Sequence, residues 1–367
     1  MTFRLRETAR VSPPETPGSE WKLSRSELRR RHRVRARLLL AVVAVIVVLG
    51  AVIPYRYYRS QVAGGSSRLS VTVSASPGEG LSQFAAVLAS KHIIGSSLIF
   101  KIWLRTQRPV VLRSGTYKFV LDSPYSQVLT TLSKGPILDQ LVIPDGLTLS
   151  QVAAKVGRLP GHSAAHFLQV ANSGAIRSPF EPSSSNSLEG LLYPDTYSFD
   201  PSTPDSTIIR MMSDAFVTEA YKLGLTPQLE KNSLSGYQIV VLASIIEKEA
   251  IYPGDGNKVA RVVLNRLSRH MNLQLDSTVF YALGKDTGHL SLADLQVKSP
   301  YNTYLNPGLP PTPISLPSVA ALQAALNPAV GSWLYYVVVQ KDGAEAFSQT
   351  YAGQLANEKL AASRGLG

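Results

Sequence analysis

An uninterrupted apolar run near the N-terminus limits what this chain can fold into more than any other feature. From Leu38 to Ile53, every residue is Leu, Ala, Val, Ile or Gly. A bilayer is crossed by about 20 residues, and Pro54 with the segment Tyr55–Arg59 can extend the run, because Tyr and Arg settle at the membrane interface. The sequence therefore predicts one transmembrane helix over residues 38–54, followed by a linker over residues 55–69.

The basic residues beside this run predict its orientation. Residues 1–37 contain ten arginines and Lys22 against four glutamates. Because such flanks stay on the cytoplasmic side, we expect a cytoplasmic tail over residues 1–37, a single pass through the plasma membrane, and the rest of the chain outside. A cleaved signal peptide is an alternative, but a clear A-x-A site is missing after Ile53. A nucleic-acid partner is not expected despite the net charge of +12, because the basic run adjoins an apolar segment and lacks interleaved aromatic residues.

The composition narrows the chemistry of the remaining chain. It contains no cysteine, which excludes disulfides, thiolate metal sites and thiol catalysis. Its six histidines show none of the usual metal-ligand spacings. We therefore expect no dedicated metal site. The apolar fraction of 44% excludes disorder of the whole chain.

Two α+β units are expected after the linker. Residues 70–138 show strand patterns at 69–73 and 115–120 and helical patterns from 81, at 97–105 and at 126–134. Residues 139–360 begin with a strand at 141–148 and a helix at 149–156, and later contain helical patterns at 236–250 and 259–270. Two β-rich runs, 333–339 and 346–351, flank Lys341-Asp342-Gly343, which predicts a hairpin. The predicted fold class is α+β, and no fixed-period repeat is present.

The predicted helix 236–250 carries two carboxylates near its end. Glu247 and Glu249 are two positions apart, about 200° around a helix, so they cannot share a face. Glu249 follows Leu242, Ile245 and Ile246 on one stripe, which predicts an apolar environment that raises its pKa and prepares a general acid. A frayed helix end with solvated carboxylates is the alternative.

Polar and aromatic residues gather in several segments outside the helices. They occur at 188–197, 274–281 and 299–304, and a Gly-Leu-Pro-Pro segment follows at 308–311. Tyr with Asn and Asp is typical of carbohydrate clefts, although the same residues also cap cores and form turns.

In this order, the segments resemble the YceG-like family of endolytic murein transglycosylases. The matching pieces are EGLLYPDTY at 189–197, LASIIEKE at 242–249, LNRL at 264–267, LQLDST at 273–278, SPYNTY at 299–304 and GLPP at 308–311. The resemblance covers about 139–360 and implies a catalytic domain there, with a LysM-like unit at 70–138. This chain departs from the family pattern at Ser277, where a Pro is usual, at Thr312, and at Leu316-Pro317-Ser318.

The resemblance implies a lyase that cuts the β-1,4 bond between N-acetylmuramic acid and N-acetylglucosamine inside nascent glycan strands of peptidoglycan. It places the acid/base at Glu249 and implies 1,6-anhydromuramic ends, termination of strand elongation, and peptidoglycan synthases as possible partners. The implied mechanism requires neither a cofactor nor a metal. An inactive peptidoglycan-binding scaffold and a muramidase-type hydrolase are the alternatives. Further residues are expected to line the cleft, orient the sugars or support Glu249; these are Glu189, Asp195, Glu247, Asn265, Asp276, Thr278, Tyr301, Asn302 and Tyr304.

Overall fold

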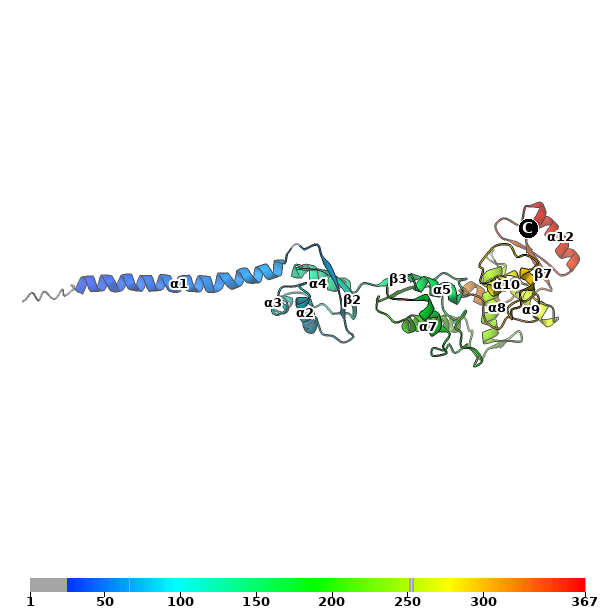
Figure 1. The fold of residues 1–367 in the computed structure, drawn as a ribbon, viewed down its shortest axis with the longest axis horizontal. Coiled ribbons are helices and arrows are strands. Elements are labelled where there is room, and N and C mark those ends of the chain that lie inside the picture. Colours follow the sequence, from blue (N-terminus) through cyan, green and yellow to red (C-terminus); the bar gives the residue numbers. More distant parts are fainter. Residues whose placement is uncertain (1–24, 66, 251, 253, 367) are drawn as a thin grey trace, which may run out of the picture. The chain divides into compact units, whose positions relative to one another are not determined.

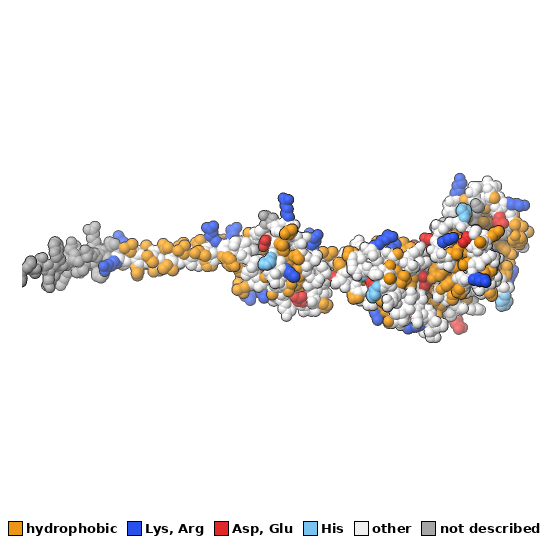
Figure 2. Space-filling view, viewed as in Figure 1, with side chains coloured by type: hydrophobic (Ala, Val, Ile, Leu, Met, Phe, Trp, Pro, Cys, Tyr) orange, Lys and Arg blue, Asp and Glu red, His pale blue; other side chains and the backbone are white. Residues whose placement is uncertain are grey.

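The computed structural model describes residues 25–65, 67–250, 252 and 254–366, with the side chains of the first helix from Arg35 onward. That helix, α1 (Arg25–Ala63), contains a stretch that is long and apolar enough to cross a membrane (Figures 1 and 2). It extends beyond the predicted 38–54 on both sides and ends just before Gly64, whose φ is +65°. The predicted tail lies outside the described residues as far as Ser24.

The chain divides into two compact units. The first comprises Met1–Leu69, Ala85–Pro109 and Val120–Leu129, and the second comprises Ser70–Phe84, Val110–Phe119 and Thr130–Gly367. The elements up to residue 134 are β1 (Ser70–Ala75), α2 (Leu81–Ser90), α3 (Ser97–Leu104), β2 (Gly115–Val120) and α4 (Tyr125–Lys134). These bounds follow the sequence prediction closely, and the LysM-like assignment stays a prediction.

The second unit contains every element after α4. Their order is β3 (Asp139–Val142), α5 (Leu149–Val156), α6 (Ala164–Ala171), β4 (Thr196–Phe199), α7 (Asp205–Lys222), β5 (Glu230–Lys231), β6 (Leu234–Ser235), α8 (Gly236–Glu249), α9 (Gly256–Ser268), α10 (Asp276–Leu283), η1 (Asp294–Gln296), α11 (Val319–Leu326), β7 (Tyr335–Val338), β8 (Glu345–Ser348) and α12 (Tyr351–Ser363). The sheets of the described chain are two-stranded: β1 pairs with β2, and β3 with β4, β5 with β6 and β7 with β8 form antiparallel pairs. The mixed α+β fold and the predicted hairpin are therefore confirmed.

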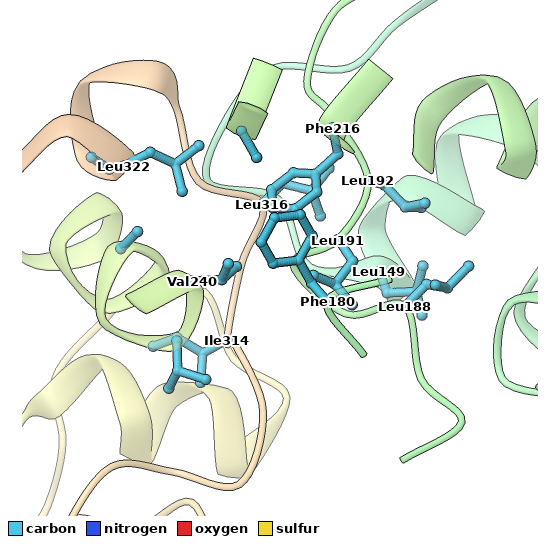
Figure 3. Close-up of a cluster of buried hydrophobic side chains, with 14 of the residues drawn as sticks. Leu149, Phe180, Leu188, Leu191, Leu192, Phe216, Val240, Ile314, Leu316 and Leu322 are labelled. Atoms are coloured by element: carbon cyan, nitrogen blue, oxygen red, sulfur yellow. The ribbon is translucent and has the colours of Figure 1, made fainter. Parts of the chain in front are cut away.

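Helix α8 lies in the core of this unit. Side chains from α8 and α11 meet those of α5 and of the loop 180–192 in one buried cluster (Figure 3). The helix begins with a capping box, in which the Ser235 hydroxyl accepts from the Gln238 N–H and the Gln238 side chain accepts from the Ser235 N–H. All residues from Ile239 to Ile246 are buried. Because α8 is fixed in the core, its last turn holds Glu247 and Glu249 in defined positions.

Candidate active site

Glu249 is the last residue of α8, and donors from two other elements meet its carboxyl group. The Ser277 N–H at the start of α10 donates to Glu249 Oε1 at 3.4 Å. The Tyr336 hydroxyl of β7 donates to Oε2 at 2.8 Å. The side chain is half-buried. Donors from helix α10 and strand β7 thus fix one carboxyl group at the end of α8.

Burial raises the pKa of Glu249, and the hydrogen bonds from Ser277 and Tyr336 oppose this rise. The direction is the one that the helix stripe predicts. A frayed and solvated helix end is excluded, because α8 remains helical through Glu249 and the carboxyl group is held on both oxygens. An acid whose pKa is raised toward neutrality is suited to donate a proton to a leaving oxygen.

Two hollows of about 430 and 370 Å³ border Glu249, and both also contain Asp276 and Tyr336 in their walls. The first hollow includes Arg266, Tyr304 and Tyr335, and the second includes Lys248, Ser277 and Glu345. Glu249 therefore borders two hollows. Two such spaces suit an extended ligand that occupies both.

Asp276 and Tyr304 are the predicted residues that the structure brings to Glu249. The Tyr304 hydroxyl donates to Asp276 Oδ1 at 2.6 Å. Asp276 is the first residue of α10 rather than its cap, and no side chain caps this helix. Both side chains border the first hollow with Glu249.

Sequence reasoning missed several residues of the same hollows. Arg266 donates to the Leu334 and Leu273 carbonyls at 2.7 and 2.6 Å, and its guanidinium group lies over the ring of Tyr335. Its position within the recognised LNRL segment was the available signal. Tyr336 and Glu345 lie on the two strands of the hairpin, and the signal for Glu345 was an acidic residue directly before the second β-rich run.

Glu247 points to a different part of the domain. Its Oε2 accepts from the Ser318 N–H, at the N-cap of α11, at 2.9 Å. Burial raises the pKa of Glu247 as well, so the chemical contrast between the two glutamates is smaller than the stripe predicts. It borders a third hollow, from which Glu249 is absent.

Glu189 is buried in a separate polar network. Its Oε1 accepts from the Leu149 N–H at 2.9 Å, and its Oε2 accepts from the Tyr281 hydroxyl at 3.0 Å. Burial raises the pKa of Glu189 to about 7. The Tyr281 ring contacts that of Tyr301 at 4.7 Å between centroids, and the Tyr301 hydroxyl pairs with Thr312 Oγ1 at 2.8 Å. This network ties α5, α10 and the 299–312 loop together.

Thr278 and Asn302 are completely buried and hold backbone segments. Thr278 Oγ1 donates to the Leu275 carbonyl at 2.6 Å and lies 2.9 Å from Thr303 Oγ1. The Asn302 amide donates to the Leu295 and Val297 carbonyls, each at 2.9 Å. These contacts hold the loop around Asn302 and the start of α10 in place.

Asn265 and Asp195 lie elsewhere. The Asn265 amide donates to the Gly331 and Trp333 carbonyls at 3.1 and 2.9 Å. Asn265 also borders a further hollow of about 790 Å³. Asp195 is exposed just before β4, where its Oδ1 accepts from the Thr196 N–H. Both side chains bind backbone groups rather than the carboxyl group of Glu249.

Comparison with known proteins identifies the family. The model of the YceG-like family matches residues 73–360. The chain belongs to the YceG-like family. A Bacillus subtilis protein named endolytic murein transglycosylase is 29% identical over 77% of this chain and 82% of its own length. A Streptococcus pneumoniae protein of the same name is 30% identical over 76% of this chain, which spans 56% of that longer protein.

A solved structure extends the comparison. The crystal structure of a yceG-like protein from Listeria monocytogenes is 31% identical, with a TM-score of 0.54, over 79% of this chain and 99% of its own. The family that the sequence segments indicate is therefore confirmed. The named relatives are enzymes of the lyase class, which agrees with the predicted class.

Proposed function

We propose that this protein is an endolytic murein transglycosylase in which Glu249 is the acid and base. The observation that carries the proposal is a half-buried carboxyl group of raised pKa that is held by Ser277 and Tyr336 and borders two hollows. A strand that is cut internally must extend in both directions from the cut bond. The names of the relatives supply the substrate class, murein.

The proposed reaction needs one carboxyl group in two successive states. Protonated Glu249 gives its proton to the glycosidic oxygen as the bond to C1 of N-acetylmuramic acid breaks. The carboxylate then takes the proton of the C6 hydroxyl, whose oxygen bonds to C1 and closes a 1,6-anhydro ring. The glutamate ends in its starting state and no water is consumed. Tyr336 and Ser277 hold the carboxyl group in place through both steps.

The proposed location follows from α1. Its apolar stretch, Arg35–Ala63, would anchor the protein in the plasma membrane, and the arginine-rich residues before it would keep the N-terminus cytoplasmic. The catalytic domain would then meet nascent strands outside, where cutting would end their elongation. Peptidoglycan synthases that make such strands are the proposed partners.

One observation favours a hydrolase as the second candidate: Glu345 is a further carboxyl group in a hollow beside Glu249. Most hydrolysing glycosidases use two carboxyl groups, one of which activates water or attacks C1. Against this, burial and the nearby Asp255 and Glu249 raise the pKa of Glu345 to about 8. A carboxyl group that keeps its proton at neutral pH is a poor base.

The test uses the full-length protein in detergent, peptide-free glycan strands and water enriched in oxygen-18. Mass spectrometry of the products reads the new ends. The proposal predicts internal cuts whose ends carry the anhydro ring and no heavy oxygen. Reducing ends that carry one heavy oxygen would establish the hydrolase, and strands left intact by folded protein would favour the binding scaffold.

A further inference from the structure

The hollow of about 370 Å³ beside Glu249 is bordered by a carboxyl group with an unpaired oxygen. Glu345 borders this hollow, and its Oε2 is buried without a hydrogen-bond partner among the described residues. Within the described part of the chain, neither side-chain oxygen of Glu345 takes part in a hydrogen bond or ion pair. Buried polar groups are normally paired, so the unpaired carboxyl group of Glu345 indicates a place for a ligand group.

The charges around Glu345 disfavour its carboxylate form. Asp255 lies at the start of α9, and its Oδ2 accepts from the Glu345 N–H at 3.1 Å. Lys258 is paired with that same Asp255 at 3.0 Å, and Lys248, across the hollow, is paired with Asp286 at 2.8 Å. Glu249 adds a second acidic neighbour. The pKa of Glu345, raised to about 8 by burial first and by Asp255 and Glu249 next, agrees with a group that retains its proton.

We propose that Glu345 is a substrate-binding residue that donates a hydrogen bond, as a neutral carboxylic acid, to the acetamido carbonyl oxygen of an N-acetylated sugar in this hollow. This inference rests on the proposed function for its substrate class. A carboxylic acid can donate through its hydroxyl, whereas a carboxylate only accepts.

The walls of the hollow match both ends of an acetamido group. Phe280, Val337 and Val338 supply apolar surface for its methyl group. Glu345 supplies the donor for its carbonyl oxygen. The same sugar would then lie beside Glu249, which also borders the hollow. Glu345 thereby selects acetylated over de-acetylated strands.

The test measures binding rather than turnover. Full-length protein carrying Glu249→Gln, which cannot transfer the proton, is titrated calorimetrically with peptide-free murein strands and with the same strands after chemical de-N-acetylation. In this background Glu345→Ala should weaken binding of the acetylated strands about tenfold and leave the de-acetylated strands unchanged. Glu345→Gln, which keeps a neutral donor, should bind acetylated strands within about threefold of its parent.

Two controls keep the result independent of folding and of the reaction. Glu230→Gln, an exposed residue of β5, should change neither affinity, and thermal melting checks that each variant is folded. Equal weakening toward both kinds of strand would overturn the inference, as would a Gln variant as weak as the Ala variant. Failure of the wild type to cut strands would reject the proposed function alone, because the binding comparison decides the role of Glu345 without it.

Binding as a function of pH adds a second readout. Affinity of the Glu249→Gln protein for acetylated strands should fall as the rising pH removes the proton of Glu345. In this background the fall should come below the pKa of about 8 that Glu345 has in the wild type, because the charge of Glu249 no longer helps to raise it. With Glu345→Gln added, that fall should vanish. A fall that persists unchanged in the Gln variant would contradict the proposal.

Discussion

The network around Glu189 and the hollows around Glu249 are both built on buried carboxyl groups, but they use the oxygens differently. Glu189 has a donor on each oxygen, from Leu149 and Tyr281, and is almost completely buried. Glu249 is half-buried and borders two hollows, one of which also contains Glu345, whose Oε2 has no hydrogen-bond partner in the part of the chain that the structure describes. Burial raises the pKa of all three groups. A raised pKa therefore does not identify the reactive group here; access and unused hydrogen-bonding capacity do.

If the hollows around Glu249 form the active site, removing one hydrogen-bond donor to Glu249 should change the reaction rate more than the stability of the fold. Tyr336→Phe keeps the ring but deletes the hydroxyl that holds Glu249 Oε2. We expect kcat to fall about tenfold. Because the lost hydrogen bond lowers the pKa of Glu249, its removal should move the alkaline decline of activity to higher pH. Steady-state kinetics between pH 5 and 9 measure both, and a decline that moves to lower pH would contradict the assigned contact.

In the network around Glu189, the same kind of change should affect the stability of the fold instead. Glu189→Ala leaves the Leu149 N–H and the Tyr281 hydroxyl without their acceptor, which should lower the free energy of unfolding by about 1–3 kcal/mol. Glu189→Gln retains an oxygen acceptor and should lose less. Urea denaturation measures the difference. Activity per folded molecule should stay near that of the wild type, and a selective loss of kcat would place Glu189 in the reaction.

The smallest effect concerns the pH dependence of stability. Because the pKa of Glu189 is about 7 in the folded protein and about 4.5 unfolded, the folded state binds the extra proton between these values. Its contribution is fully present below about pH 4.5 and is lost as the pH rises through about 7. Glu189→Gln should therefore flatten the decline of stability over this window. An unchanged slope in the variant would show that other groups cause it.

Local sequence patterns predicted the scaffold of the site well. The helical pattern at 236–250 corresponds to α8, and the stripe through Leu242, Ile245 and Ile246 is buried. The Lys341-Asp342-Gly343 turn joins β7 and β8, in which Val338 pairs with Glu345. These features depend on neighbours along the chain, so periodicity and turn chemistry suffice to find them.

The composition of the site was less predictable, because it depends on contacts between distant segments. The polar SPYNTY segment indicates a cleft, yet Asn302 within it is buried and holds the Leu295 and Val297 carbonyls. An amide suits a sugar hydroxyl and a backbone carbonyl equally well, so its residue type cannot distinguish the two. Tyr336 and Glu345 reach Glu249 only because the hairpin folds against the end of α8. No local sequence pattern predicts how the hairpin packs against α8.

The most direct test of the account compares Glu249→Gln with Glu189→Gln in the full-length protein, side by side. The rate at which anhydro ends form is measured per folded molecule, and each variant is melted. The account predicts that Glu249→Gln loses about 10²- to 10⁴-fold in rate with an unchanged melting temperature, while Glu189→Gln keeps its rate. Retention of the wild-type rate by folded Glu249→Gln protein would contradict the account.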